Sequence, residues 1–393
     1  MTRPSIRPKD FETQGVFAQA AAFYPLLELV GEYLKEKGTL SDVRLAWHCH
    51  LTALTAVSAK ALAMGGCKVA LSECNPATSD ADAIAYMSEI LGFKTYTGED
   101  SVKNVLHGGA DVVSDTGFDL LTYWLSDDLN AVDIPLWGAS EITTSGITRL
   151  RSRESIPIPV ININDGQIKS FVENYHGVGD GVIEALKALT GRSFQGERAC
   201  VIGYGRVGAG VAEYLKRNGV QVTVVEHDSV RSLMAHFDGF PLASLREAVA
   251  ASTLMVTATG KKGLLSVDDW RHARDGLLAI NVGHWREELS YADLEQAAES
   301  VTAISADVDE FKLTSHDGKP LRIRIATKGD PCNVTLLTGS IEPTLLHLAT
   351  EILSLEYLVT NKENLKPGEM CVPPEVENLA AELALQVSNP RLR

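Results

Sequence analysis

A glycine-rich turn in the middle of the chain places the strongest constraint on its fold. The segment Ala199-Cys-Val-Ile-Gly-Tyr-Gly-Arg-Val-Gly-Ala-Gly210 runs from an apolar stretch through Gly203, Gly205 and Gly208 into a helical pattern, and a second apolar stretch ends at Glu226. In a dinucleotide-binding βαβ unit, these glycines permit a tight turn, admit a pyrophosphate and allow close helix–strand packing. The acid accepts hydrogen bonds from the ribose hydroxyls. No Arg follows it directly, so the pattern predicts NAD rather than NADP.

Strand-like and helical patterns alternate along most of the chain, which predicts parallel sheets covered by helices. Apolar runs predict strands at Val43–Trp47, Lys68–Leu71, Asp111–Val113, Pro157–Asn164, Thr253–Thr257 and Leu277–Asn281. Helical spacing predicts helices at Phe17–Lys37, Leu51–Met64, Ala81–Leu91, Gly177–Leu189 and from Pro343 onward. We expect an α/β protein with two doubly wound parallel-sheet domains.

Charge and composition exclude several classes of partner. The chain has 393 residues and a formal net charge of -15, which disfavours a nucleic-acid polymer as partner. We expect no contact with a membrane, because no apolar run approaches the length of a span and the N-terminus has no signal-like apolar region. Six cysteines without a CxxC pair are typical of a reduced, cytoplasmic protein.

One cluster of metal-binding residue types stands near the N-terminus. His48-Cys49-His50 lies ahead of Cys67 and Cys74, but this spacing matches no zinc pattern, and isolated cysteines are usually small buried hydrophobes. We expect no metal site.

Several polar motifs surround the glycine turn. They are His50-Leu-Thr52, Cys74-Asn75, Ser114-Asp-Thr-Gly117, Ser140-Glu-Ile-Thr-Thr-Ser-Gly146, Asn162-Ile-Asn-Asp165 with Lys169, Glu173-Asn174, Thr257-Ala-Thr-Gly260, Asn281-Val-Gly-His284 and Asn333. In this order, from about His50 to Asn333, the chain resembles the S-adenosylhomocysteine hydrolase (adenosylhomocysteinase) family. The agreement of independent motifs is far more specific than the glycines alone.

The resemblance implies an arrangement of domains and a reaction cycle. It implies a substrate domain from residues 1–176, an inserted NAD-binding Rossmann domain from 177–340 and a C-terminal helical return from 341–393, assembled as a homodimer or homotetramer. NAD stays tightly bound. A nucleoside 3′-hydroxyl is oxidised to a ketone, the acidified C4′ proton leaves, the 5′ substituent is eliminated, water adds, and the ketone is reduced.

The chemistry of single residues fits this cycle. Oxidation of an alcohol needs a base, for which Lys169 is the candidate with Glu173 beside it. Elimination needs a proton donor, for which we expect His50 oriented by Asp115. Asp115 precedes a Thr-Gly turn, so an alternative is that it only caps this turn. His284 completes the expected catalytic set.

The resemblance also implies binding residues. For the substrate they are Thr52, Ile142 and Asn174. For NAD they are Gly203, Gly205, Arg206, Val207, Gly208, Glu226, Thr143, Thr144, Ser145, Thr257, Ala258, Thr259, Gly260, Val282, Gly283, His284 and Asn333.

The chain departs from the family at substrate contacts. Ile142 stands where the family has a Glu that contacts the ribose, and Leu54 where it commonly has a polar residue that reads adenine. The family's Ser-Thr-Gln-Asp run appears as Ala77–Asp80, and its Gly-His gate as Gly339-Ser340. The tail, which ends at Pro390-Arg-Leu-Arg393, lacks the Lys and Tyr that reach a neighbouring subunit's NAD in the family.

These departures favour a specialised relative that releases a 4′,5′-unsaturated nucleoside, as in nucleoside-antibiotic pathways. The alternatives are an ordinary adenosylhomocysteinase, an inactive NAD-binding regulatory homologue, and a 2-hydroxy-acid dehydrogenase. The dehydrogenase is the weaker alternative, because the Arg and His–acid motifs of that class are absent from this chain at the expected strand ends.

Overall fold

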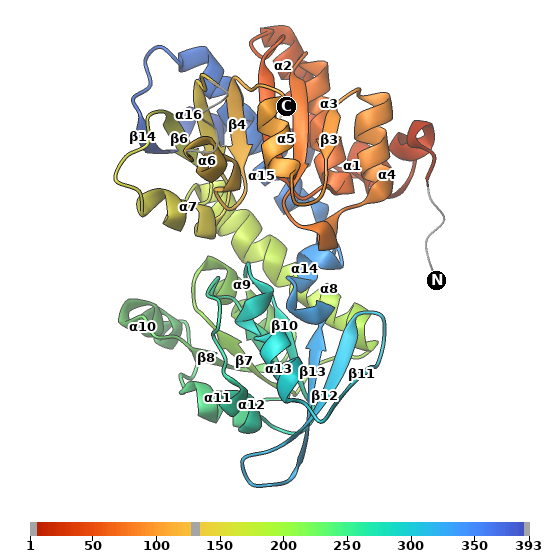
Figure 1. Cartoon of the computed structure of the whole chain (residues 1–393), viewed down its shortest axis with the longest axis vertical. Coiled ribbons are helices and arrows are strands. Elements are labelled where there is room, and N and C mark those ends of the chain that lie inside the picture. The colour runs from red at the N-terminus through yellow and green to blue at the C-terminus, as the bar shows by residue number, and fades with distance from the viewer. Residues whose placement is uncertain (1–5, 127–133, 389–393) are drawn as a thin grey trace. The chain divides into compact units, whose positions relative to one another are not determined.

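The computed structural model describes residues 6–126 and 134–388, and the chain divides into two compact units. Unit 1 consists of Met1–Ser170 and Ile341–Arg393, and unit 2 of Phe171–Ser340. Unit 2 therefore interrupts unit 1 in the sequence (Figure 1). The tail residues Pro390–Arg393 lie outside the described part of the chain.

The sheet of unit 1 is parallel throughout, with strand order β14-β6-β5-β4-β1-β2-β3. The chain proceeds outward from β1 to β3 in one direction and from β4 to β14 in the other. The strands are β1 (Arg44–Cys49), β2 (Lys68–Glu73), β3 (Lys94–Tyr96), β4 (Val112–Asp115), β5 (Gly138–Glu141), β6 (Pro159–Asn162) and β14 (Gly368–Cys371).

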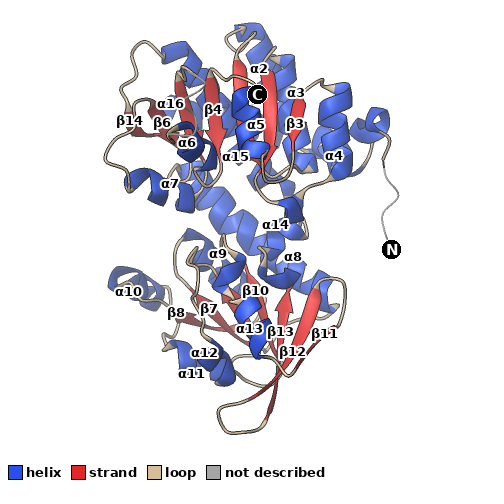
Figure 2. Ribbon diagram, viewed as in Figure 1, coloured by secondary structure: helices blue, strands red, loops and turns tan. Residues whose placement is uncertain are grey.

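Helices cover both faces of this sheet because successive side chains of a strand point to opposite faces (Figure 2). Ala46 joins a core cluster with Val105 and Leu121, whereas its neighbour Trp47 bonds to Glu351 on the other side. The helices are η1 (Pro8–Thr13), α1 (Gly15–Phe23), α2 (Leu26–Lys37), α3 (Ala53–Met64), η2 (Pro76–Thr78), α4 (Ala81–Ala85), η3 (Tyr86–Ile90), α5 (Ser101–His107), α6 (Asp119–Trp124), α7 (Thr144–Arg151), α15 (Ile341–Asn361) and α16 (Pro374–Ser388).

Two of the predicted helices differ from the structure. The predicted helix over Phe17–Lys37 is two helices, because Pro25 removes a backbone donor and ends the pattern between α1 and α2. The predicted helix over Ala81–Leu91 changes from α4 into the π-helical turn η3.

The sheet of unit 2 has strand order β11-β12-β13-β10-β9-β7-β8. Strands β13, β10, β9, β7 and β8 are parallel, whereas β11–β12 and β12–β13 pair antiparallel. The predicted doubly wound α/β class is confirmed, and the sheet differs from an all-parallel one only through these two antiparallel pairings at its edge. The strands are β7 (Arg198–Ile202), β8 (Gln221–Val225), β9 (Leu254–Thr257), β10 (Leu277–Asn281), β11 (Ser300–Ala303), β12 (Val308–Thr314) and β13 (Pro320–Ala326).

Two core clusters lie on opposite faces of this sheet. Ala199 and Val201 belong to the cluster under α8 and α9, and Cys200 and Ile202 to the cluster under α11, α12 and α13. The helices are η5 (Ile168–Gly177), which spans the boundary between the units, α8 (Val178–Thr190), α9 (Arg206–Arg217), α10 (Ser229–Phe237), α11 (Leu245–Ala251), α12 (Val267–Arg271), η6 (Arg286–Glu288), α13 (Tyr291–Ala297), η7 (Thr327–Gly329) and α14 (Cys332–Thr335).

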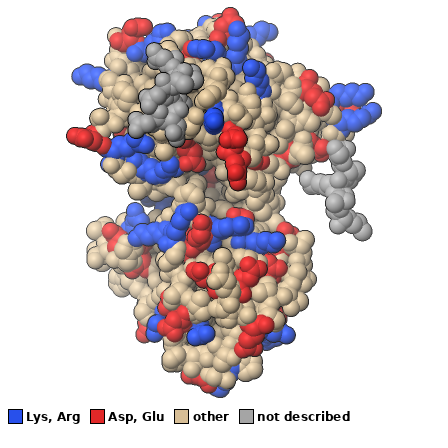
Figure 3. Space-filling view, viewed as in Figure 1, with Lys and Arg blue, Asp and Glu red and all other residues tan. Residues whose placement is uncertain are grey.

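The surface carries both signs of charge, with acidic and basic side chains interspersed on the face shown in Figure 3. Within the described residues, every helix is too short or too polar to cross a membrane.

Candidate functional site

The glycine turn lies where the strand order of unit 2 reverses. The chain runs from β7 to β8 in one direction and from β9 through β10 to β13 in the other, so the switch falls between β7 and β9. Ligands of open α/β sheets bind outside the carboxyl ends of the strands at this point. Gly203 follows β7 and Ala258 follows β9, and both loops therefore lie at the expected position.

Backbone packing requires glycine at two positions of this turn. Gly203 has φ +98°, and a Cβ there would lie 2.8 Å from the Ala258 carbonyl oxygen. A Cβ on Gly208 would lie 2.0 Å from the carbonyl oxygen of Gly203, well inside van der Waals contact. Arg206 begins α9 with its guanidinium 3.9 Å from the centre of the Phe171 ring, and Val207 packs against the core.

Glu226 organises the glycine turn from the end of β8. Its carboxylate accepts hydrogen bonds from the amides of Tyr204 (2.7 Å), His227 (2.7 Å) and Asp228 (2.9 Å). Burial alone would raise the pKa of Glu226, but these amides outweigh it and hold the pKa below its ordinary value. The imidazole of His227 also lies close, with its Nδ1 2.9 Å from Glu226 Oε1.

Glu288 is a central acceptor that sequence reasoning missed. This fully buried carboxylate accepts bonds from the Thr259 amide (3.0 Å) and hydroxyl (2.8 Å), the Gly260 amide (2.9 Å) and the His284 amide (3.1 Å). A Cβ on Gly283 would lie 1.8 Å from Glu288 Oε1, so only glycine fits beside it. Glu288 thus holds the loops after β9 and β10 together.

The polar end of β10 supports the same loops. Asn281 Oδ1 accepts bonds from the Thr257 hydroxyl (3.1 Å) and the Gly283 amide (2.8 Å), and its Nδ2 donates to the Trp285 and Gly329 carbonyls. Val282 is buried after this strand, and the His284 ring lies edge-on to Trp285 at 4.3 Å.

The residues of unit 2 fit a bound dinucleotide. The glycine turn leaves no room for a Cβ at Gly203 or Gly208, and Glu226 directly follows the second strand of the unit. On α14, the buried Oδ1 of Asn333 has no hydrogen-bond partner among the described residues. Buried polar atoms normally have partners, so a bound amide donor such as a nicotinamide carboxamide would supply the missing one.

The strand order of unit 1 reverses between β1 and β4. His50 follows β1 and Asp115 ends β4. Thr116 comes directly after β4, and its hydroxyl donates to the His48 carbonyl (2.7 Å). By the same rule, the candidate acid–base groups lie at a ligand-binding edge.

The hydrogen bonds of His50 define its tautomer. Thr78 Oγ1 donates its only proton to the Asn75 carbonyl (2.8 Å), so it accepts a bond from His50 Nδ1 (2.8 Å). The imidazole therefore keeps its Nδ1 proton, and Nε2 is the atom that can gain or lose one.

The carboxylate of Asp115 caps a helix. It accepts bonds from the amides of Thr116, Asp119, Leu120 and Leu121, with distances of 2.9–3.2 Å. Burial raises the pKa of Asp115, and the imidazole of His48 counters part of this effect. These bonds favour the capping role over the orientation of His50.

Glu141, at the end of β5, is a second buried acceptor. It accepts bonds from the Gly117, Phe118 and Thr143 amides and from the Thr143 hydroxyl (2.6 Å). A Cβ on Gly146 would lie 2.2 Å from its Cδ.

The threonines that follow Glu141 have structural partners of their own. Thr143 caps α7 by accepting a bond from the Gly146 amide. Thr144 donates to Asn164 Oδ1 (2.9 Å), and Ser145 donates to Thr143 Oγ1 (3.2 Å).

Two expected substrate residues are buried. Ile142 is 9% exposed and has no group that could pair with a hydroxyl. Thr52 caps α3, where its side chain accepts a bond from the Thr55 amide.

Lys169 is half-buried in the π-helical segment η5, which also carries Glu173 and Asn174. This segment is ten residues long, and π-helical geometry within helices occurs frequently at functional sites. Two buried groups of α15 feel the charge of Lys169. Burial, aided by this charge, lowers the pKa of His347 well below its ordinary value.

Glu351 is the second of these groups. Its Oε1 accepts bonds from Trp47 Nε1 (2.8 Å) and the Ser114 hydroxyl, whereas Oε2 has no hydrogen-bond partner within the described segments. Burial raises the pKa of Glu351 to about 7, although Ser114, Trp47 and Lys169 act against it. Glu351 is therefore a titrating carboxyl beside the candidate base.

We expect Glu351→Gln to remove a stability loss that the native protein suffers as the pH rises. The pKa of Glu351 is raised in the folded state. The stability of the folded protein is therefore fully retained below about pH 4.5, where Glu351 is protonated in both states, and it falls as the pH rises to about 7. The shift corresponds to about 3 kcal/mol. Urea unfolding across this pH range should show that the free energy of unfolding of the variant, relative to that of the native protein, rises by about this amount.

Glu356→Gln, on the partly exposed side of the same helix, is the control for removing one acid. Unfolding curves of Glu351→Gln and the native protein that stay parallel across the range would contradict this account.

Comparison with known proteins agrees with this geometry. Residues 174–336 match the family model described as "S-adenosyl-L-homocysteine hydrolase, NAD binding domain". An adenosylhomocysteinase from Pyrococcus abyssi is 30% identical over 376 residues, which cover 93% of this chain and 88% of the relative. An adenosylhomocysteinase from Sulfurisphaera tokodaii is 31% identical over 371 residues, which cover 92% and 88%. An S-inosyl-L-homocysteine hydrolase from Methanocaldococcus jannaschii is 29% identical over 378 residues, which cover 92% and 88%.

The fold and the glycine turn define an NAD-binding α/β enzyme. With the relatives aligned over most of its length, the chain belongs to the adenosylhomocysteinase family, and its cofactor is NAD.

Proposed function

We propose that this enzyme is a nucleoside 4′,5′-dehydratase that oxidises a 3′-hydroxyl, expels the 5′-hydroxyl as water and reduces the ketone again. Ile142 carries this proposal. An acid of the family contacts the ribose at this position, and the buried isoleucine cannot do so. An unpaired hydroxyl there would cost about 1–3 kcal/mol, which disfavours the family's usual ribose contact.

The segment at the family's gate position supports the same proposal. The Ser340 amide and hydroxyl donate to Asp180 Oδ2 (3.1 and 2.8 Å), and the Gly339 amide donates to Glu184 Oε2 (2.8 Å). These bonds hold the segment against α8, and no imidazole stands at this position. The chain has therefore altered both its ribose contact and its gate.

Lys169 is the proposed base of the oxidation. It takes the proton of the 3′-hydroxyl and returns it at the end of the cycle, with Glu351 setting the charge around it. Bound NAD would supply reversible hydride transfer at C3′. Glu173, on the same π-helical segment, is proposed to orient Lys169.

His50 is the proposed group for the elimination. Its Nε2 removes the C4′ proton, which the 3′-ketone has acidified, and the resulting imidazolium gives a proton to the departing 5′ oxygen. Thr78 holds the ring throughout by accepting from Nδ1. The C4′–H and C5′–O bonds break, a C4′=C5′ bond forms and one water leaves, so the cycle has no net redox change.

Product analysis tests the proposal. Purified enzyme is incubated separately with adenine nucleosides that carry a free 5′-hydroxyl, with S-adenosylhomocysteine and with S-inosylhomocysteine. We expect mass spectrometry to find a nucleoside product lighter by one water. Efficient release of homocysteine from either thioether would overturn the proposal.

Isotope labels separate the steps. A substrate deuterated at C3′ should give a product that keeps its label, because the hydride is borrowed and returned. In heavy water, recovered substrate should gain deuterium at C4′ if His50 exchanges this proton before the 5′ oxygen leaves. Loss of the C3′ label to solvent would contradict an internal redox cycle.

The hydrolase activity by which the relatives are named is the second candidate, favoured by the identity over most of the chain. The product analysis distinguishes the two. An inactive regulatory homologue is disfavoured because Lys169, His50 and His284 are all present.

A further inference from the structure

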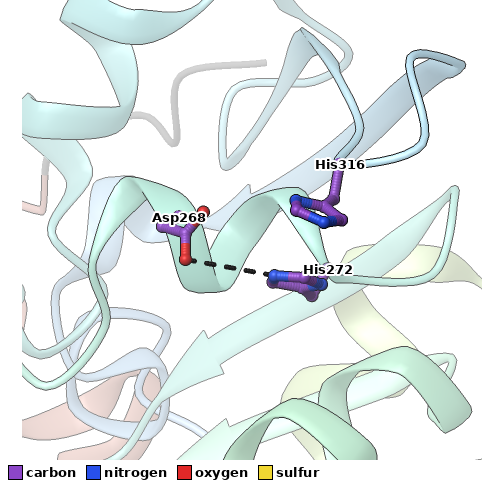
Figure 4. A group of neighbouring side chains, drawn as sticks. All are labelled: Asp268, His272 and His316. Carbon is purple, nitrogen blue, oxygen red and sulfur yellow. Dashed lines mark ion pairs between the residues drawn. The ribbon is translucent and has the colours of Figure 1, made fainter.

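A cluster of three metal-ligating side chains lies on the surface of unit 2. Asp268 lies on α12, His272 follows its last residue, and His316 lies in the turn between β12 and β13 (Figure 4). One ligand atom from each side chain lies within 4.8 Å of the others. The two imidazole rings are 4.5 Å apart at their centres.

The backbone holds the β12–β13 turn beside α12. The His316 amide donates to the Arg271 carbonyl (3.0 Å), which ties the turn to the end of α12. Arg246 Nη2 lies 2.6 Å from Asp268 Oδ2, but both side chains are exposed, and a surface ion pair of this kind is weak enough for the carboxylate to turn.

A second observation points to a ligand at this place. His272 Nε2 is buried and has no hydrogen-bond partner among the described residues. The nearest carboxylate oxygen, Asp268 Oδ2, is 3.9 Å away, which is too far for a hydrogen bond. A nitrogen that has lost water without gaining a partner is the exception in folded proteins.

We propose that Asp268, His272 and His316 bind one zinc ion. Two imidazole nitrogens and a carboxylate oxygen with an open fourth position are a zinc ligand set. Calcium and magnesium prefer oxygen ligands alone. Zinc requires bonds of about 2.0–2.2 Å, which the exposed Asp268 and His316 reach by turning their side chains inward.

The site is separate from the NAD-binding loops. Its turn precedes β13 and lies at the amino end of that strand, whereas the glycine turn and the Thr257 loop follow the carboxyl ends of β7 and β9, which run in the same direction. The zinc ion therefore joins α12 to the β12–β13 turn and takes no part in catalysis. This proposal differs from the expectation of no metal site, which was based on the spacing of residues around His48.

The test uses untagged, full-length protein carrying Cys371→Ser, because Cys371 is an exposed thiol that could bind zinc. Chelator-treated protein is titrated with zinc chloride by calorimetry. We expect one zinc per chain and a higher melting temperature with zinc. His316→Ala should weaken binding by about 100-fold or more, and Asp268→Asn by about 10-fold.

His236→Ala is the matched control, because His236 is an exposed histidine of α10 in the same unit. It should bind zinc as the parent does. Unchanged NAD content in every variant shows that unit 2 is folded. Cobalt titration should give visible bands without thiolate charge-transfer absorption. Absence of binding, or equal binding by the parent and His272→Ala, would overturn the proposal.

Discussion

Replacing Lys169 with Met is expected to abolish the reduction of enzyme-bound NAD by substrate and to lower turnover by about 1,000-fold. Met has a similar length but cannot accept the proton of the 3′-hydroxyl, so oxidation cannot begin. The near-ultraviolet absorbance of NADH after rapid mixing of enzyme and substrate measures this step directly.

Lys187→Met provides the control, because Lys187 is an exposed lysine on α8. It should leave both NAD reduction and turnover unchanged. If the Lys169 variant still reduced its bound NAD at the native rate, Lys169 would not be the base of the oxidation.

Glu288→Ala is expected to release NAD and to destabilise unit 2 by about 3 kcal/mol or more, because a buried donor left unpaired costs about 1–3 kcal/mol. The change leaves four donors from Thr259, Gly260 and His284 without their buried acceptor, and each unpaired donor is costly. The loops after β9 and β10 should then separate. Nucleotide freed by acid and the melting temperature of the protein measure the two effects.

Glu287→Ala is a closely matched control, since Glu287 is the exposed neighbour and makes an ion pair with Lys262. Such surface pairs contribute little. Glu288→Gln retains acceptor capacity on one oxygen and should fall between the native protein and Glu288→Ala. Full NAD content in Glu288→Ala would refute the role of this carboxylate in the loops.

The sequence predicts the strands, the class of fold and the turn at Gly203 because these depend on local periodicity and on short-range backbone demands. It also places polar residues at strand ends, where both sheets reverse their order. The break at Pro25 could have been foreseen, since proline ends helical patterns. The antiparallel edge of unit 2 could also have been foreseen, since β12 and β13 alternate apolar with charged residues and are joined by a turn that contains Asp317-Gly318.

The buried acceptors escape sequence reasoning for another reason. Glu288 accepts a hydrogen bond from an amide 29 residues earlier in the sequence. Glu351 accepts bonds from Trp47 and Ser114, which are separated from it in the sequence by the whole of unit 2. No spacing in the sequence marks such a carboxylate. The role of Asp115, in contrast, could be predicted from the sequence. Its capping partners lie within a few residues of it, and the Thr-Gly turn that follows indicates a cap.

The split of unit 1 across the sequence has a consequence for synthesis on the ribosome. Strand β14 pairs with β6, and α15 supplies Glu351 to Trp47, so both must emerge before this unit can close. Unit 2 is translated in full before either appears. Until β14 has been synthesised, the backbone groups along the edge of β6 have no strand to pair with, and Trp47 lacks the carboxylate that accepts its hydrogen bond. An unpaired strand edge can pair with another chain and aggregate, so the unfinished protein depends on its last residues to cover this edge.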